Sequence, residues 1–319
     1  MMRLLAAMAL IAVTGAAAAQ PYPSRPIRMI VPNPAGGAND IVARIVAQKL
    51  AAILGQQVVV DNRGGAGGAI GAEIAAAAAP DGHTLLAATF ATHTTIPHLH
   101  KKIAYDPLNG YAPIALFAVQ MSLLSAHPGF PPNTVKELIA FAKARPGAIN
   151  YASAGPGSTS DFTGRLLARM ADVQFTLVPY KGGGPAITAL LSGEAQINFG
   201  PIPATGPHVR AGRLKALAVS GETRSIALPE VPTVAESGVP GYSSAAWVGL
   251  MAPRGTPRAI VERLTEAAKE AIGGAEVREQ LVKTGAEPAY RPPQPFAQFV
   301  RAEYERYGKL VRELGLGAL

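Results

Sequence analysis

The sequence VPNPAGGANDIVAR (Val31–Arg44) is typical of a strand end, a Pro/Gly loop and the start of a helix. Residues 26–31 form a short apolar run that ends at Pro32, as a buried strand does before a turn. Gly36 and Gly37 carry no Cβ, so the backbone can turn tightly here and pass close to a bound group. The stretch predicts the first strand, loop and helix of an α/β fold.

The helix that follows extends from about Asn39 to Leu54, with apolar residues at helical spacing. We expect Asn39 or Asp40 to lie at or next to its N-cap, and Gly55 to end it. The first N–H groups of such a helix have no partner within the helix, so carboxylates and phosphates bind readily there. Alone, this is weak evidence for a ligand, since many α/β proteins have a tight first turn that binds nothing.

Strands and helices alternate beyond this first helix. Residues 57–61 and 83–89 are expected strands, and a helix of small residues, 69–79, lies between them. This order is typical of βαβ units and a parallel sheet. An irregular segment, 90–113, is then followed by a long apolar strand, 114–124, which we expect to leave the first domain.

The next part of the chain repeats the order of strand, glycine loop and helix. A strand, 149–154, leads to Gly155 and then to a helix that begins near Ser158. Two such blocks predict two α/β lobes that face each other, with a ligand cleft at the carboxyl ends of their strands. Further strands are expected at 175–180, 196–200 and 214–219, and further helices after Thr134, at 185–192, after Thr233, at 256–272 and from Pro295 onward.

The N-terminus has the features of a secretory signal peptide. Arg3 precedes an apolar run, 4–13, and small residues, 17–19, form a cleavage pattern. We assign residues 1–19 to this signal and expect a periplasmic protein. The sequence contains no cysteine, which excludes a lipid anchor on cysteine, a disulfide and a thiolate metal site.

The composition narrows the class of protein. The 319 residues are 49% hydrophobic and 16% charged, as in a globular chain with a sizeable core. The net charge of +8 suits an acidic small molecule, but the basic residues are scattered and accompanied by one Trp. We therefore expect no nucleic-acid partner, no cofactor and a monomer.

Several blocks beyond Val31–Arg44 have a recognisable sequence. They are Tyr22–Ile27, Val58–Arg63, Gly65–Gly68, Ile70–Glu73, Pro80–Gly82, Tyr105–Pro107, Asn150–Gly155, Val178–Gly182 and Leu228–Glu236. Together and in this order, they resemble the periplasmic receptors of the tripartite tricarboxylate transporter family, the Bug-type solute-binding proteins. The resemblance covers essentially the whole chain after the signal peptide.

The resemblance implies a two-lobed, periplasmic-binding-protein-like α/β fold of type II (a Venus flytrap), with lobe 1 formed by 20–122 and 223–319 and lobe 2 by 123–222. It implies a receptor without catalysis that delivers a small carboxylate to a membrane permease. The solute would be a dicarboxylate, a tricarboxylate, an aromatic acid or an amino acid. The ligand-binding residues that it implies are Asn33, Ala35, Gly36, Gly37, Ala38, Asn39, Asp40, Thr89, Thr92, His93, Gly155, Ser158, Thr159, Ser160, Asp161 and Gly200.

The chain departs from the family pattern around the expected cleft. Asn33 stands where the family usually has an aromatic residue, and Ala35 where it has a second proline. Asn39 replaces a common threonine, and Asp161 a frequent histidine. Gly200-Pro201 replaces an Asp-Asn pair. We therefore expect the carboxylate clamp to be kept and the far end of the pocket to differ.

Ser158, Thr159 and Ser160 offer hydroxyl and N–H groups at a helix start. Ser158 and Asp161 also have the spacing of a capping box, which needs no ligand. We favour a ligand role for the three hydroxyl residues, because the first loop has the same arrangement. For Asp161 two interpretations stay open. It pairs with Arg165 one turn later, which we favour, or it receives an amine or hydroxyl group of the ligand.

Other candidate sites have less support. His93, His98 and His100 lie in one segment, but only Asp106 is near them in sequence, so we expect no metal site. Lys181 precedes a run of glycines instead of following a GxxxxG run, which does not fit a phosphate loop.

Two other functions stay open as alternatives. An exported hydrolase would use the cleft for chemistry, but the sequence has no G-x-S-x-G elbow and no evident Ser/His/Asp arrangement. A ligand-sensing subunit for a membrane kinase would differ from a transport receptor only in its partner, which the sequence does not identify.

Overall fold

The structure is a computed structural model that describes residues 22–155, 158–313 and 315. In these residues the strands are β1 (Ile27–Val31), β2 (Val58–Asn62), β3 (Thr84–Thr89), β4 (Tyr111–Ala126), β5 (Asn150–Ser153), β6 (Thr176–Pro179), β7 (Ile197–Pro201), β8 (Lys215–Val219), β9 (Ala245–Pro253) and β10 (Glu287–Arg291). The helices are α1 (Ala38–Leu54), α2 (Ala69–Ala76), α3 (Ile96–Leu99), α4 (Val135–Ala144), α5 (Thr159–Ala171), α6 (Gly183–Ser192), α7 (Ile202–Arg210), α8 (Arg258–Gly273), α9 (Ala275–Lys283) and α10 (Pro293–Glu313), with short helical turns η1 (Ala66–Gly68) and η2 (Ala91–Thr95). The predicted signal peptide, residues 1–19, lies outside the described part of the chain.

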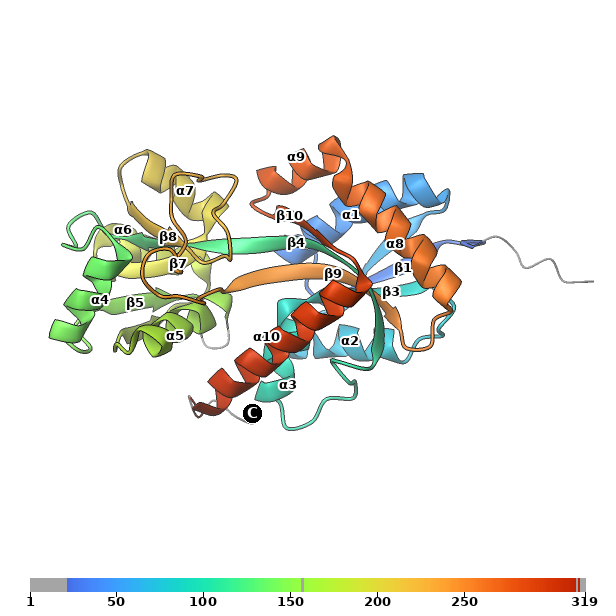
Figure 1. Cartoon of the computed structure of the whole chain (residues 1–319), viewed down its shortest axis with the longest axis horizontal. Coiled ribbons are helices and arrows are strands. Elements are labelled where there is room, and N and C mark those ends of the chain that lie inside the picture. The colour runs from blue at the N-terminus through green and yellow to red at the C-terminus, as the bar shows by residue number, and fades with distance from the viewer. Residues whose placement is uncertain (1–21, 156–157, 314, 316–319) are drawn as a thin grey trace, which may run out of the picture.

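Two α/β lobes lie side by side and are joined by long strands (Figure 1). The strands form one sheet in the order β2-β1-β3-β9-β4-β7-β5-β6, and β8 and β10 also pair with β4. The first lobe contains β1 to β3 with α1, α2, α8 and α9, and the second contains β5 to β8 with α4 to α7 (Figure 1). The predicted α/β fold with two lobes is confirmed.

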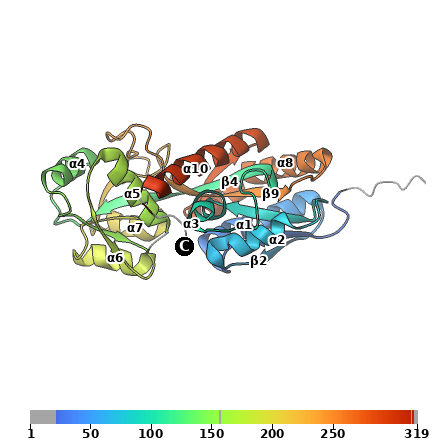
Figure 2. The same cartoon turned by 90° about the horizontal axis from the view of Figure 1, so that it is seen from below.

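Helices cover both faces of the sheet in the first lobe (Figures 1 and 2). Helices α1, α8 and α9 pack on one face, in a core that includes Val46, Leu50 and Leu264. Helices α2 and α10 pack on the other face, where Trp247 meets Phe296 edge to face at 5.6 Å between ring centroids. Trp247 is fully buried in this core.

The first strand–loop–helix unit has the predicted form. Strands β1 and β2 pair in parallel, and α1 ends at Gly55, whose φ of 70° is the left-handed conformation of a C-cap glycine. The predicted N-cap is wrong by two or three residues, because Gly37 is the N-cap. Asn39 and Asp40 are the second and third residues of the helix, where Asp40 can reach back to the loop.

Strand β4 passes from the first lobe into the second (Figure 1). It pairs with β9 as far as Met121, and it pairs with β7 from Ser122 onward. The change of partner between adjacent residues confirms that the predicted long strand leaves the first domain. The lobe bounds deduced from the resemblance stay a prediction.

The second lobe also follows the predicted pattern in part. Strands β5, β6 and β7 pair in parallel, and α4 begins at Thr134, whose Oγ1 accepts the Glu137 N–H at 3.2 Å. The predicted helix after Thr134 is thus confirmed. Helix α6 begins at Gly183, so Pro185 is its third residue instead of its first.

Some elements do not follow from the sequence patterns. The expectation of an irregular segment from 90 to 113 is wrong, because η2 and α3 lie within it. The predicted helix after Thr233 is also wrong. Thr233 donates its N–H to Glu236 Oε2 at 2.8 Å and accepts the Glu236 N–H at 3.0 Å, but this capping box closes a turn. No helix in the described ranges is long and apolar enough to cross a membrane.

Helix α10 connects the two lobes a second time (Figure 1). It packs on η2 and β4, and Tyr307 meets Phe162 of α5 at 6.0 Å between ring centroids. Arg169 of α5 donates from Nε to Glu313 Oε2 at 2.9 Å. The helix that carries the second site loop therefore rests on α10.

Candidate functional site

The first loop of the site, residues 33–37, connects β1 to α1. Gly36 has a φ of 79°, which a residue with a Cβ rarely adopts, so the turn requires glycine here. The side chains at the two ends of the loop meet, because Asn39 Nδ2 donates to Asn33 Oδ1 at 3.1 Å. This hydrogen bond links the start of the loop, just after β1, to the first turn of α1.

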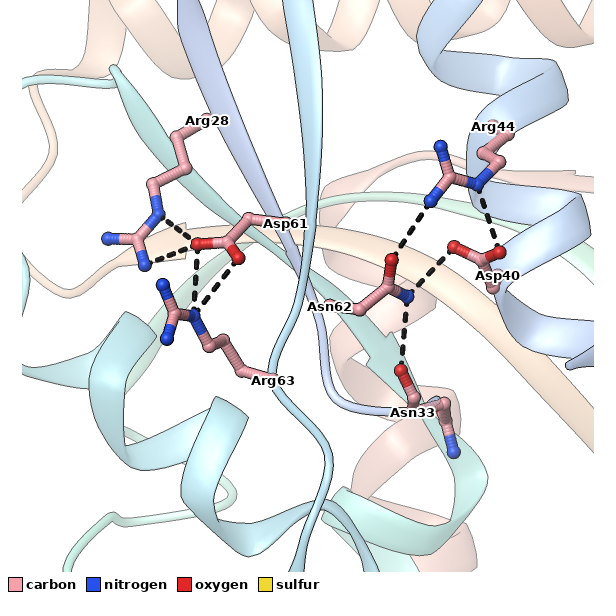
Figure 3. Close-up of polar contacts among 7 residues, drawn as sticks. All are labelled: Arg28, Asn33, Asp40, Arg44, Asp61, Asn62 and Arg63. Carbon is pink, nitrogen blue, oxygen red and sulfur yellow. Dashed lines mark hydrogen bonds and ion pairs between the residues drawn. The ribbon is translucent and has the colours of Figure 1, made fainter. Parts of the chain in front are cut away.

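Asp40 stabilises this loop through hydrogen bonds to its buried carboxylate. Its carboxylate accepts the Gly36 N–H at 2.8 Å, Arg44 Nε at 2.9 Å and Asn62 Nδ2 at 2.8 Å (Figure 3). Asn62 Nδ2 also donates to the carbonyl oxygen of Asn33 at 3.0 Å. We call Asn33, Asp40, Arg44 and Asn62 the Asp40 cluster.

The negative charge of the buried Asp40 carboxylate is compensated by the groups that donate to it. Burial raises its pKa, but the hydrogen bonds from Arg44, Gly36 and Asn62 and the charge of Arg44 outweigh burial and lower the pKa below its usual range. Asp40 is 1% exposed and does not line the cleft. The structure thus gives it a supporting place behind the loop, and the ligand contact implied by the resemblance stays a prediction.

A second cluster of charged residues lies beside the first. Asp61 accepts Arg28 Nε at 2.7 Å and Arg63 Nε at 3.0 Å (Figure 3). Asp61 precedes Asn62 in β2, but its ion pairs do not include any residue of the first loop. The two clusters are therefore separate in their contacts.

The second loop of the site connects β5 to α5. Ser158 is the N-cap of α5: its Oγ accepts the Asp161 N–H at 3.2 Å and donates to the carbonyl oxygen of Gly155 at 2.6 Å. Ser160 Oγ accepts the Ala154 N–H at 2.9 Å. Ser158 and Ser160 thus shape the loop with their hydroxyl groups.

Asp161 has the contacts of a capping box and an ion pair. Arg165 Nε donates to Asp161 Oδ1 at 2.8 Å, one turn along α5. Asp161 is 2% exposed and is not among the described residues that line the cleft. The geometry agrees with the structural interpretation that the sequence favours, and a ligand contact of Asp161 stays a prediction.

A cleft of about 580 Å³ lies between the two loops. The first lobe contributes residues 33–39, and α5 contributes Thr159. Of the predicted ligand-binding residues, the cleft brings together Asn33, Ala35, Gly36, Gly37, Ala38, Asn39 and Thr159.

Other lining residues were not predicted. They are Gln120, Met121, Ser122, Pro203, Ala246, Thr284 and Gly285. Most come from the strands that cross between the lobes and from turns distant in sequence. Local sequence patterns offer no signal for them, because only the tertiary fold brings these segments to one cleft. Pro34 and Pro201 also line the cleft, and they belong to the first loop and to the Gly200-Pro201 pair that the sequence places there.

Residues in the first turns of α1 and α5 line this cleft, namely Ala38, Asn39 and Thr159. Within the described residues, no group accepts from the N–H of Ala38, Asn39 or Asp40 in the first turn of α1, or from that of Thr159 or Ser160 in α5. The first turn of a helix carries partial positive charge, so both helix ends attract an anion. The arrangement can hold a carboxylate between two helix N-termini.

Thr89, Thr92 and His93 are buried and are not among the described residues that line the cleft, so their ligand role stays a prediction. The three side chains are at most 1% exposed, and Thr92 Oγ1 lies 3.2 Å from Thr89 Oγ1 and 2.8 Å from His93 Nδ1. The His93 ring packs against Tyr111 and Trp247. These hydroxyl groups satisfy one another in the core.

His93 is neutral in this environment. Burial lowers its pKa to about 3, and the hydrogen bond with Thr89 opposes this only in part. Among the described residues, no group of three or more His, Asp or Glu side chains is placed to hold a metal ion.

Two of the predicted glycines, Gly200 and Gly155, are not among the described residues that line the cleft, and each has a structural role. Gly200 is buried in β7, where a Cβ would overlap the side chains of Thr205 and Asn198, so glycine permits the close approach of α7. Its neighbour Pro201 lines the cleft instead. Gly155 has a φ of 112° and accepts the Ser158 hydroxyl.

Comparisons with known proteins agree with this geometry. A family model described as "Tripartite tricarboxylate transporter family receptor" matches residues 42–316. The chain is 38% identical to Protein BugT of Bordetella pertussis over 320 residues, which cover 99% of this chain and 98% of that protein.

Solved structures show the same fold. The structure of Rpa4515 of R. palustris with adipate has a TM-score of 0.76 and 35% identity, over 93% of this chain and 100% of that chain. A TctC solute binding protein from Polaromonas with no ligand has a TM-score of 0.83 and 29% identity, over 92% of this chain and 99% of that chain. The two-lobed α/β architecture is thus that of periplasmic binding proteins.

Proposed function

Because the chain belongs to the tripartite tricarboxylate transporter receptor family, we propose that it captures a small carboxylate between its lobes and delivers it to the permease of such a secondary transporter. The family consists of binding receptors, so the chain is a binding protein and not an enzyme. The observation that carries the proposal is the cleft with the N-termini of α1 and α5 on its two sides. We place the protein in the periplasm.

The clamp contributes only part of the affinity. A hydrogen bond to a charged group contributes about 1.5–3 kcal/mol, and a partly buried helix N-terminus up to about 2 kcal/mol. Micromolar binding requires about 8 kcal/mol after the costs of ordering are subtracted. The remainder comes from the far end of the solute and from closure of the lobes, so these determine selectivity.

The lobes close on the solute in this proposal. The predicted bounds place lobe 1 at 20–122 and 223–319 and lobe 2 at 123–222. The change of partner strand of β4 at Met121–Ser122 supports the first of these boundaries.

A thermal-shift screen of the purified protein against small carboxylates tests the proposal. The panel contains dicarboxylates, tricarboxylates, aromatic acids and amino acids. A ligand at a hundred times its dissociation constant stabilises the folded state by about 2.7 kcal/mol, which raises the melting temperature measurably. We expect a shift for carboxylates that disappears when the carboxylate is amidated.

A ligand that copurifies with the protein would hide this shift. The protein is therefore unfolded, dialysed and refolded before a second screen. No shift with any acid after refolding would contradict the proposal. Copurification of a permease subunit supports the transport role, whereas capture of a membrane kinase in its place would favour the sensor interpretation.

A further inference from the structure

The wall of the cleft opposite the two loops has its own chemistry. We call Gln120, Met121, Ser122, Pro203, Ala246 and Thr284 the distal wall. Gln120 to Ser122 are the residues at which β4 passes between the lobes, and Ala246 lies in β9 beside them. Thr284 and Pro203 come from opposite lobes. The distal wall therefore meets the end of a solute whose carboxylate lies at the helix N-termini.

The two lobes already touch at one side of this wall. Gly285 follows Thr284 and has a φ of 78°, and a Cβ there would overlap the ring of Pro203. This contact bounds the cleft and limits the length of the solute. Closure brings the far end of the solute against the wall and not into water.

Two polar side chains of the distal wall are neutral and available. The side-chain amide of Gln120 and the hydroxyl of Ser122 make no hydrogen bond to any described residue. Gln120 can both donate and accept, and so can Ser122. Thr284 Oγ1 already donates to the carbonyl oxygen of Leu281 at 2.7 Å, and the three remaining side chains, Met121, Pro203 and Ala246, offer apolar contact.

Charged residues next to the lining residues are held by partners. Lys283 pairs with Glu279 at 2.7 Å, and Asp40 pairs with Arg44 at 2.9 Å. Asp161 pairs with Arg165 at 2.8 Å, and the residues that line the cleft are themselves neutral. A solute end at the distal wall therefore meets amide, hydroxyl and apolar groups.

The two ends of the cleft compensate charge differently. The end formed by the loops offers two helix N-termini, which stabilise one carboxylate. A second carboxylate, brought against the distal wall on closure, would lose its water and gain only neutral donors there. An amide or hydroxyl group at the same place would find matching donors and acceptors at a much lower desolvation cost.

From this asymmetry we propose that the solute is a monocarboxylate whose opposite end is uncharged and carries a hydrogen-bonding group such as an amide or a hydroxyl. This rests on the proposed function and makes it more specific. Gln120 is the main specificity-determining residue, and Ser122 is the second.

Isothermal titration calorimetry of the refolded protein with matched acids tests the proposal. Each set contains a straight-chain diacid (succinate, glutarate or adipate), its monoamide and its diamide. We expect the best monoamide to bind at least about tenfold more tightly than its diacid, and the diamide not to bind. A diacid that binds as tightly as its monoamide, or more tightly, would overturn this inference but leave the carboxylate receptor intact. Failure of every acid and monoamide would overturn both.

The variant Gln120→Lys locates the effect at the distal wall. A lysine there supplies a cation for a second carboxylate, so the ratio of diacid to monoamide affinity should rise by about tenfold or more. Gln48→Lys, at an exposed position of α1, is the control for the added charge and should leave the ratio unchanged. An unchanged ratio in Gln120→Lys would show that the far end of the solute does not meet Gln120.

Discussion

Asp40 is the residue on which the first loop depends. Its carboxylate joins the Gly36 N–H, Arg44 and Asn62 at one buried point (Figure 3). A neutral residue of the same shape keeps the packing but loses the charge that Arg44 and the loop N–H require.

We therefore expect Asp40→Asn to bind the solute about tenfold more weakly. A hydrogen bond to a charged group contributes about 1.5–3 kcal/mol, and the substitution removes part of this energy from the bonds that order the loop. Titration calorimetry measures the change. Asp61→Asn is the matched control, since Asp61 pairs with Arg28 and Arg63 and not with the loop. Equal losses of affinity in both variants would contradict the role of Asp40.

The residues of the site were predicted unevenly. The glycine loop at 33–39 and Thr159 follow from local patterns, because a loop before a helix start has the same form in any context. Thr89, Thr92 and His93 could not be placed from the sequence, since the core formed by Tyr111 and Trp247 buries them. Hydroxyl residues after a strand can serve the core as well as a ligand.

Helix α5 shows how a cap affects binding at the scale of an element. Ser158 caps α5 at the cleft, and Thr134 caps α4 away from it, each through an acceptor oxygen 3.2 Å from the N–H of the third helical residue. The third helical residue is acidic in both helices. The two caps share this N–H···O contact and differ in their place relative to the cleft.

Ser158→Ala and Thr134→Ala should each lower the free energy of unfolding by about 1 kcal/mol. Only Ser158→Ala should also weaken solute binding, by about fivefold, because its cap orders the N–H groups that meet the carboxylate. Chemical denaturation and calorimetry on the same samples measure both effects. Loss of affinity in Thr134→Ala would show that binding responds to stability in general.

Helix α10 contains a buried acid that makes the stability depend on pH. Burial raises the pKa of Glu303 to about 7, against the opposing effect of Arg306, which pairs with it at 2.5 Å. Glu222 faces it and adds to the rise, whereas Arg291 opposes it. Glu303 is therefore largely protonated in the folded protein below pH 7.

The folded state binds the Glu303 proton more tightly than the unfolded state does. The bound proton therefore stabilises the folded protein fully below about pH 4.5, and this contribution is lost as the pH rises to about 7. The free energy of unfolding should fall by about 3 kcal/mol across this range from Glu303 alone. Glu303→Gln should remove this fall, whereas Glu305→Gln, at an exposed position of the same helix, should keep it. Denaturant titrations between pH 4.5 and 8 measure the difference.

Elements with a strong local pattern were predicted, and elements that depend on tertiary contacts were not. Strand β9 contains Trp247 in an apolar run without alternation, so its strand character depends on pairing with β3 and β4. Helix α7 contains Pro203 and Pro207, which normally argue against a helix. The capping box at Thr233 forms its hydrogen bonds without a helix after it, because local chemistry specifies the turn and not its continuation.

The whole molecule combines two lobes, two crossing strands and one bridging helix. Strand β4 and strand β9 join the lobes at the distal wall, and α10 contacts α5 through Tyr307 and the pair of Arg169 and Glu313 (Figure 1). The strands permit bending, and the contacts of α5 with α10 oppose it. The two-lobed arrangement could be predicted because a strand–loop–helix unit occurs twice, but the contact between Pro203 and Gly285 could not, since only the fold brings those residues together.

The central claim is that one solute is held by both lobes, and small-angle X-ray scattering tests it most directly. A ligand that contacts both lobes favours the closed form by its difference in affinity for the two forms. The account predicts a smaller radius of gyration with saturating carboxylate than in the refolded, ligand-free protein, and no change with the amidated analogue. Scattering curves that coincide with and without a carboxylate known from calorimetry to bind would contradict it.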